Sequence, residues 1–169
     1  MGLPERIVPE QPAMPVVVFR AGAHCCAISA ETVECVIPVV AIDAVPGAPR
    51  AVLGIINFHG TVVPVVDPRR RFGERGGELE LGQKLILVNT PTRLVALLND
   101  RIEGVEPIAP ELIASMEDFV PGAGKLKGLA AWQDGLVFVH DPGLLLTQAE
   151  EKRVDAALRR SQPRARPTD

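Results

Sequence analysis

Aromatic residues are scarce: the 169-residue sequence contains no tyrosine, one tryptophan and five phenylalanines. Proteins that bind single-stranded nucleic acid stack bases on aromatic side chains along a positively charged groove. The net charge of −3 and the isoelectric point near 5.7 supply no such positive field. The arginine run at 69–71 is short and is typical of a solvated loop. We therefore expect no nucleic acid among the partners.

Long apolar runs are also missing. No continuous apolar stretch reaches the roughly 18 residues that a membrane-spanning helix requires. The first residues, 1–6, lack the hydrophobic region of a secretory signal peptide. We therefore expect a cytoplasmic protein that does not insert directly into a membrane.

Cysteine is limited to Cys25, Cys26 and Cys35. An odd number that includes two neighbours makes a poor disulfide framework, because adjacent residues on a strand point to opposite faces. Reduced, partly buried thiols are the simpler interpretation. A metal site would have to recruit His24, Cys26 and Cys35, but the ligand spacing that zinc sites usually repeat is absent. The sequence therefore predicts no metal and no cofactor.

Catalytic motifs are absent as well. His59, His140, Ser29 and Ser115 are the side chains that a catalytic site could use. None of them lies in a nucleophile elbow, a phosphate-binding glycine loop or a pair of histidines at zinc-binding spacing. The sequence therefore predicts no catalytic residues and favours a binding protein over an enzyme. Exposed valine and isoleucine side chains of a strand face are the expected contact surface.

What the sequence does contain is a glycine-centred hairpin over residues 53–67. Two β-branched apolar runs flank His59 and Gly60, which we expect to form the turn. Glycine takes at little cost the positive φ that a two-residue turn between twisted strands requires. Pro64 cannot donate a hydrogen bond to a neighbouring strand, so we expect its strand at a sheet edge or a bulge at this position.

A second hairpin at 128–142 repeats this design, with Asp134 and Gly135 as the expected turn. The repetition extends further along the chain. A shift of 69 positions aligns residues 16–39 with residues 85–108, and a shift of 74 positions aligns the two hairpins. The order of strands, turn and Asp-Pro stop is the same in both blocks. We interpret this pattern as an internal duplication of a β-rich unit.

Local patterns predict the remaining strands. In the first copy we expect strands at 16–19 and 25–29, followed by residues 30–37, whose spacing is compatible with a helix or a strand. In the second copy we expect strands at 84–88 and 93–98. The segments expected to lack regular structure are the loop 46–49, the polar linker 74–80 and the insertion 108–127.

The C-terminal part is expected to be helical. Thr147 and Glu150 have the spacing of a capping box, and Val154, Ala157 and Leu158 form one apolar stripe. These features predict a helix over 148–160. The flanking expectations are a mobile arm at 1–14, rich in proline and charge, and a disordered tail at 161–169.

The hairpin from Gly54 to Asp67 contains the string Gly-x-x-Asn-x-x-Gly-x-x-x-Pro-x-x-Asp. This string carries most specifically a resemblance of residues 15–147 to the CheW family of bacterial chemotaxis coupling proteins. The resemblance implies an all-β fold of two intertwined five-stranded SH3-like barrels. Their expected ranges are about 30–72 for the first barrel and about 83–147 for the second, with the N-terminal strands shared between them.

The resemblance also implies a function. It predicts a non-enzymatic signalling adaptor that couples the cytoplasmic tip of a methyl-accepting chemoreceptor to the regulatory domain of a CheA-type histidine kinase. Such an adaptor is recruited to receptor arrays at the membrane. The alternative that the residues leave open is a small cytosolic β-barrel that binds another protein or ligand.

By position, the resemblance assigns partner contacts to residues around the groove between the barrels and at the hairpin. Two of them depart from the family pattern, which usually has arginine at position 59 and often an acidic residue at position 35. Histidine at position 59 lacks the fixed charge and planar donors of arginine, so we expect a divergent family member. The predicted contact residues are Val33, Cys35, Val36, Gly54, Asn57, His59 and Gly60.

Overall fold

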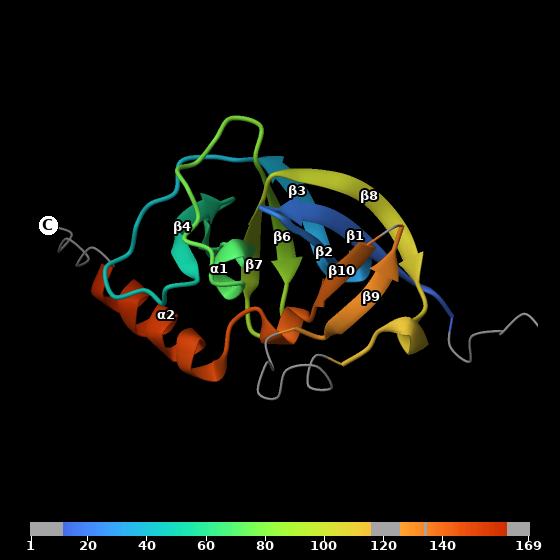
Figure 1. The fold of residues 1–169 in the computed structure, drawn as a ribbon. Coiled ribbons are helices and arrows are strands. Elements are labelled where there is room, and N and C mark those ends of the chain that lie inside the picture. Colours follow the sequence, from blue (N-terminus) through green and yellow to red (C-terminus); the bar gives the residue numbers. More distant parts are fainter. Residues whose placement is uncertain (1–11, 116–125, 134, 162–169) are drawn as a thin grey trace, which may run out of the picture.

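The computed structural model describes residues 12–115, 126–133 and 135–161. Within these residues the chain is mostly β, with ten strands and two α-helices (Figure 1). The helices are α1 (Pro68–Arg71) and α2 (Gln148–Ser161). The strands are β1 (Met14–Ala21), β2 (His24–Ser29), β3 (Val33–Pro38), β4 (Val52–Phe58), β5 (Thr61–Val66), β6 (Lys84–Asn89), β7 (Leu94–Asn99), β8 (Arg101–Ile108), β9 (Gly128–Trp132) and β10 (Gly135–His140).

The strands form two five-stranded sheets. One sheet has the order β8-β1-β2-β10-β9, and the other has the order β3-β6-β7-β5-β4. We refer to them as barrel A and barrel B, respectively. Each has a parallel pair at the same place: β10 beside β2 in barrel A, and β5 beside β7 in barrel B. All other strand pairs within the sheets are antiparallel.

The two strand orders are the same once the duplication is taken into account. Strands β1–β5 belong to the first copy and β6–β10 to the second, and exchanging each strand for its counterpart converts one order into the other. The isolated bridges outside the strands repeat as well, because Asp43 pairs with Ile55 and Ala114 with Leu129. The predicted internal duplication is therefore confirmed in three dimensions.

Each barrel combines strands of both copies, so the barrels are intertwined as expected. The predicted ranges, about 30–72 and 83–147, assigned β6 and β7 to the second barrel. In the structure these strands pair with β3 and β5 in barrel B, and β1 and β2 complete barrel A. The two copies have the same apolar pattern, so sequence similarity alone does not distinguish pairing within a copy from pairing across copies.

The central strands are buried on both faces. In β1, β2, β6 and β7 four or more consecutive residues are buried, which explains their unbroken apolar runs. One set of their side chains fills the interior of a barrel, and the alternate set meets the other barrel. The apolar core between the barrels includes Phe19, Ile28, Ile86 and Leu97. Each fully buried side chain of this kind contributes roughly 1.5–3 kcal/mol.

The first hairpin has the predicted turn. His59 has a φ of 49° and Gly60 a φ of 86°, and Phe58 pairs with Thr61 on either side of them. The second hairpin differs from the prediction, because Gly135 pairs with Trp132 and is the first residue of β10. The turn begins instead at Gln133, which has a φ of 50°. The other residue of the predicted turn, Asp134, lies outside the described residues.

The expectation for Pro64 was wrong. Its strand β5 is internal to barrel B, between β7 and β4, and the register of the β4–β5 pair shifts near Val52 and Gly54 instead. The parallel pairing with β7 involves only Val65 and Val66. Since this pairing starts after Pro64, the missing N–H group of the proline is not needed by β7.

The C-terminal helix α2 packs against the core between the barrels (Figure 1). The backbone N–H of Glu150 donates to the Thr147 hydroxyl at 3.1 Å, and that of Thr147 donates to the Glu150 carboxylate at 2.9 Å. This confirms the predicted capping box. Val154 and Ala157 are buried, and Leu158 packs against the same core. No helix of the described residues is long and apolar enough to cross a bilayer.

Residues 30–37, for which helix and strand were both open, form a short 3-10 turn followed by β3. The loop 46–49 and the linker 74–80 contain no helix or strand. Most of the predicted mobile arm and disordered tail, residues 1–11 and 162–169, lies outside the described residues, as does the central part of the insertion at 116–125.

Candidate functional site

Strand β3 alternates between exposed and half-buried side chains, as a strand covered on one face does. Val33 packs against the core between the barrels, and Cys35 packs against the interior of barrel B. Val36 points outward and is 41% exposed. Of the three predicted contact residues on β3, Val36 therefore offers the most apolar surface to a partner.

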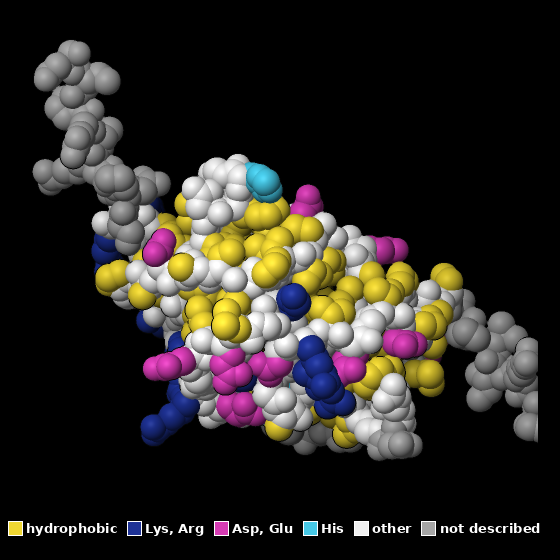
Figure 2. Space-filling view, turned by 90° about the horizontal axis from the view of Figure 1, so that it is seen from above, with side chains coloured by type: hydrophobic (Ala, Val, Ile, Leu, Met, Phe, Trp, Pro, Cys, Tyr) yellow, Lys and Arg dark blue, Asp and Glu magenta, His cyan; other side chains and the backbone are white. Residues whose placement is uncertain are grey.

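Strand β8 presents an equivalent side chain. Val105 lies 69 positions after Val36 and is 63% exposed. Both strands are outer strands of their sheets and lie near the top of the view in Figure 1. Seen from above in Figure 2, hydrophobic side chains gather across this side of the molecule. We use the name β3–β8 face for the outward sides of these two strands, with Val36 and Val105.

A carboxylate lies near each valine of the β3–β8 face, at equivalent bulges in the strands. Glu103 accepts hydrogen bonds from the Nε atoms of Arg101 at 2.8 Å and Arg20 at 3.2 Å, and these two bonds lower its pKa. Glu34 accepts instead from the neutral amide of Asn89 at 2.8 Å. On β3 the carboxylate of Glu34 is thus hydrogen-bonded to a neutral amide, whereas on β8 the carboxylate of Glu103 is hydrogen-bonded to two arginines.

The tip of the β4–β5 hairpin is a second exposed feature. The side-chain oxygen of Asn57 accepts a hydrogen bond from the backbone N–H of Gly60 at 2.8 Å, which stabilises the turn. The ring of His59 lies edge-on to that of Phe58, with 4.4 Å between the centroids. Asn57, His59 and Gly60 are all exposed. Among them, His59 has the side chain best suited to a charged or aromatic contact.

Gly54, another predicted contact residue, is buried. A Cβ atom at this position would lie only 2.2 Å from the carbonyl oxygen of Asp43, whose backbone pairs with Ile55. A Cβ atom added at Gly128, the counterpart in the second copy, would likewise lie 2.2 Å from the carbonyl oxygen of Ala114. The structure thus gives Gly54 a packing role, which permits two backbone segments to approach closely.

The predicted contact residues fall into two groups, because β3 and β4 are the two outer strands of barrel B. One group includes Val36 on β3, and the other is the hairpin tip. The sequence analysis missed Val105, although the shift of 69 positions that revealed the duplication leads directly from Val36 to it. Val62 and Leu136, 48% and 58% exposed, are a further pair, related by the shift of 74 positions.

The remaining histidines are buried (His140) or partly buried (His24). His140 is 3% exposed, and burial followed by the nearby charge of Arg71 lowers its pKa to about 4. The ring of His24 stacks on Phe72 with 3.9 Å between centroids, and its Nδ1 lies 3.1 Å from a Glu74 carboxylate oxygen. Both histidines thus pack against aromatic rings, and His24 also lines a pocket with Cys25 and Phe138.

The side chains considered for a metal site are divided between clusters. Cys26 lies in the core between the barrels, where burial raises the pKa of its thiol, and Cys35 packs against the interior of barrel B. In the part of the chain that the structure describes, no three His, Cys, Asp or Glu side chains are grouped so that they could hold a metal ion. The exposed features of the site are therefore apolar strand faces, a carboxylate and a hairpin tip.

Comparisons with known proteins agree with the fold. The model of the CheW-like domain family matches residues 15–150. The chemotaxis protein CheW of Klebsiella aerogenes is 25% identical over 116 residues, which cover 68% of this chain and 70% of that protein. The chemotaxis protein CheW of Rhizobium meliloti is 33% identical over 73 residues, or 43% of this chain and 47% of that protein.

A solved structure matches over most of the chain. The scaffolding protein TtCheW of Thermoanaerobacter tengcongensis superposes with a TM-score of 0.69 and is 23% identical, covering 82% of this chain and 95% of that one. At this level of identity the match supports the fold, which is that of two SH3-like barrels. The predicted fold class is thereby confirmed.

Proposed function

Because this chain belongs to the CheW-like domain family, we propose that it is a non-enzymatic adaptor of a chemosensory pathway. In this role it couples the cytoplasmic tip of a methyl-accepting chemoreceptor to the regulatory domain of a CheA-type histidine kinase. Relatives that are named chemotaxis proteins and a structural match that is named a scaffolding protein support the proposal. The site of action is then the cytoplasmic side of receptor arrays at the membrane.

The observation that carries the proposal is the β3–β8 face. Val36 and Val105 are exposed on equivalent outer strands, one in each barrel. Neighbouring apolar side chains that remain in water on a folded domain are typical of a protein-binding surface. Burial of such surface contributes about 25 cal/mol per Å² before the costs of association are subtracted. A protein partner suits a strand face better than a small molecule does, because small molecules bind in concave pockets.

The hairpin tip is the second contact in this proposal. Its exposed His59 and the turn formed by Asn57 and Gly60 would meet the other partner, and the packing of Gly54 holds the hairpin in place. Histidine at position 59 cannot form the planar, permanently charged contact of the arginine that the family usually has there. We infer that this chain is a divergent member, matched to a partner with a different surface at this point.

The proposal is tested by placing a charge in the β3–β8 face. We expect Val36→Asp to weaken binding of a chemoreceptor cytoplasmic fragment from the same genome about ten- to thousand-fold, because an unpaired carboxylate would be desolvated in the contact. Isothermal titration calorimetry measures this affinity, and the same experiment with the kinase regulatory domain shows which partner uses the face.

The matched control is Leu112→Asp. This variant also replaces an exposed apolar side chain by a carboxylate, but Leu112 belongs to the short 3-10 turn after β8 and not to the β3–β8 face. It should bind like the unmodified protein. Circular dichroism must show that Val36→Asp keeps its fold, as expected for a side chain that is 41% exposed. Unchanged affinity of the folded variant for both partners would refute the assignment of this face.

A further inference from the structure

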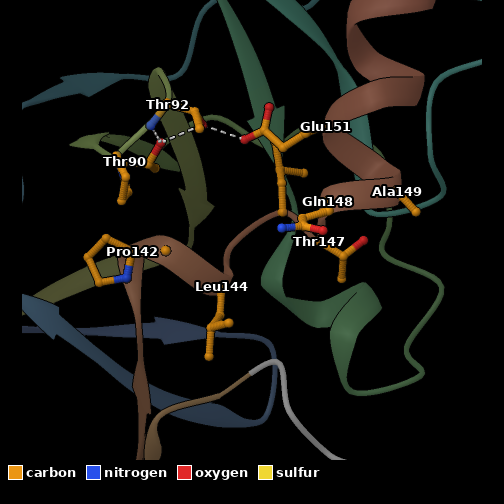
Figure 3. Close-up of a pocket in the computed structure, with 11 residues that line it drawn as sticks. Thr90, Thr92, Pro142, Leu144, Thr147, Gln148, Ala149 and Glu151 are labelled. Carbon is orange, nitrogen blue, oxygen red and sulfur yellow. Dashed lines mark hydrogen bonds between the residues drawn. The ribbon is translucent and has the colours of Figure 1, made fainter.

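A groove of about 710 Å³ lies between the β6–β7 turn, the residues after β10 and the start of α2. Figure 3 shows Thr90 and Thr92 on one side, Pro142 and Leu144 on another, and Gln148 and Glu151 on the helix. The lining is mostly apolar. The groove shares no lining residue with the β3–β8 face or the hairpin tip.

The first copy contains the same elements, and there an arginine occupies the corresponding space. By the shifts of the duplication, residues 90–92 correspond to 21–23, and residues 142–144 correspond to 68–70. The side chain of Arg69 lies over Gly22, where an added Cβ would be 3.2 Å from its Cδ. Only 13% of the Arg69 side chain is exposed. The side chain of Arg69 thus occupies space in the first copy for which Gly143 supplies no side chain in the second.

The filling side chain is held by a carboxylate. The Nε of Arg69 donates to Asp67 Oδ1 at 3.0 Å, and a terminal nitrogen donates to Oδ2 at 2.9 Å. Asp67 also accepts the backbone N–H of Arg69 at 3.0 Å and is fully buried. The hydrogen bond to Asp67 raises the pKa of the guanidinium. This is a bidentate arginine–carboxylate pair, which is stronger and more directional than a single neutral hydrogen bond.

The second copy keeps the carboxylate but has lost the arginine. Asp141 accepts the backbone N–H of Gly143 at 2.8 Å, as Asp67 does from Arg69, but position 143 has no side chain. Within the described residues, no arginine or lysine forms an ion pair with Asp141. An added Cβ at Gly143 would lie 3.3 Å from Asp141 Oδ1 and 3.9 Å from Pro91 in the groove wall.

We propose that this groove receives an arginine side chain from a partner protein. The guanidinium takes the place that Arg69 takes in the first copy, and its methylene groups lie along the apolar wall. It pairs with Asp141, which does not itself line the groove but whose Oδ1 lies 3.3 Å from the Cβ position of the lining residue Gly143. Arginine fits better than lysine, because the planar guanidinium can donate two parallel hydrogen bonds to one carboxylate. The carboxylate of Glu151 does not compete strongly for it, since Glu151 already pairs with Arg93 at 2.7 Å.

The walls of the groove indicate what flanks the arginine. Leu144 is 36% exposed, and Pro91 and Pro142 line the groove beside it. These apolar groups can cover apolar neighbours of the arginine in a peptide segment, which a free amino acid would not provide. The partner segment therefore has the chemistry of an arginine between apolar residues.

The test uses two capped tripeptides, acetyl-Leu-Arg-Leu-amide and its citrulline analogue, which keeps the shape but lacks the charge. Each is titrated into the full-length ¹⁵N-labelled protein, and amide chemical shifts are followed by NMR. We expect saturable shifts at Thr90, Thr92 and Gly143, with a Kd at least ten-fold lower for the arginine peptide. Equal affinities, or shifts confined to other residues, would overturn the proposal.

Two variants test the assignment of the site. Gly143→Arg reproduces the first copy and should abolish peptide binding by filling the groove; Gly143 does not have a positive φ, so its backbone accepts a side chain. Asp141→Asn keeps an oxygen for the Gly143 amide and should weaken binding at least ten-fold, whereas the matched control Glu78→Gln on the linker should not. Unchanged binding by Asp141→Asn would sink the proposal even if Gly143→Arg did not fold. The titration contains no receptor or kinase, so its failure would leave the adaptor proposal intact.

Discussion

The two barrels have the same strand order but differ in the side chains at equivalent positions. Strand order, parallel pairs, isolated bridges and the left-handed conformation of the equivalent turn residues His59 and Gln133 repeat. Three differences stand out at equivalent positions. These are Val66 and His140 in the core, Arg69 and Gly143 at the groove, and Asn89 and Arg20 beside the bulge glutamates.

Positions that are identical in both copies indicate which residues the fold requires. Where one backbone segment crosses another, both copies have glycine, because any Cβ would overlap a carbonyl oxygen. Where a side chain only fills a space or pairs with a charge, the two copies have different amino acids. The equivalent positions that differ are therefore the places where one barrel can have acquired a role that the other lacks.

The largest expected effect is at the crossing glycines. Gly54→Ala and Gly128→Ala should each lower the free energy of unfolding by about 3 kcal/mol or more, because the added Cβ would lie 2.2 Å from a backbone oxygen and the backbone would have to shift. Urea denaturation measures both values. Gly135→Ala, which meets nothing within 4 Å, is the control and should cost much less. A small effect at only one of the two crossings would show that the barrels are not packed equivalently.

The second prediction concerns His140. Its pKa is about 4 in the folded protein, against about 6.5 for an ordinary histidine, so the unfolded chain binds a proton first as the pH falls. Stability contributed by the neutral imidazole is therefore present above about pH 6.5 and is lost progressively towards pH 4, by about 3 kcal/mol in total.

The first copy supplies the matched variant, since Val66 occupies the equivalent position. His140→Val should lose less stability between pH 7 and pH 4 than the unmodified protein does, while the contribution of carboxylates such as Glu150 stays the same in both. Urea denaturation across this pH range provides the comparison. Parallel pH dependences for the two proteins would contradict the assignment of His140 as a buried neutral group.

The smallest expected effect is at the hairpin turn. Gln133 adopts in the second copy the same left-handed conformation as His59, with φ of 50° and 49°. His59→Gln should therefore change the free energy of unfolding by less than about 0.5 kcal/mol. If the tip contacts the kinase or receptor, His59→Gln should weaken the binding of that partner, because glutamine lacks the imidazole ring that lies edge-on to Phe58. Isothermal titration calorimetry with each partner measures this effect; equal affinities of the two proteins for both partners would mean that His59 has no part in recognition.

Much of the local structure could be predicted from the sequence. The first hairpin with its turn at His59 and Gly60, the capping box at Thr147 and Glu150, and the duplication all depend on residues close together in the chain or on a constant shift. The turn of the second hairpin was misplaced by one residue. Asp-Gly is a typical turn pair, so the turn was expected at Asp134 and Gly135. The pairing of Trp132 with Gly135 instead makes Gln133 the first turn residue.

The candidate site was only partly predictable. The position of Val36 on β3 follows from the family resemblance, but its outward direction depends on the bulge at Glu34, which sets the register with β6. The burial of Gly54 against Asp43 and the groove beside Gly143 depend on contacts between segments that the sequence does not show to be neighbours. The sequence could have identified Val105, because it is the counterpart of Val36 under the same shift.

The internal duplication, the two glycine-containing hairpins and the capped C-terminal helix can all be recognised in the amino-acid sequence alone. Periodicity, turn chemistry and capping act over a few residues, so they can be recognised locally. The distribution of the strands over the barrels, in which β1 and β2 complete barrel A and β6 and β7 complete barrel B, becomes visible only in the pairing of distant segments. Both copies present the same apolar strands, and the choice between them rests on how three cores are filled at once, which is a property of the whole molecule.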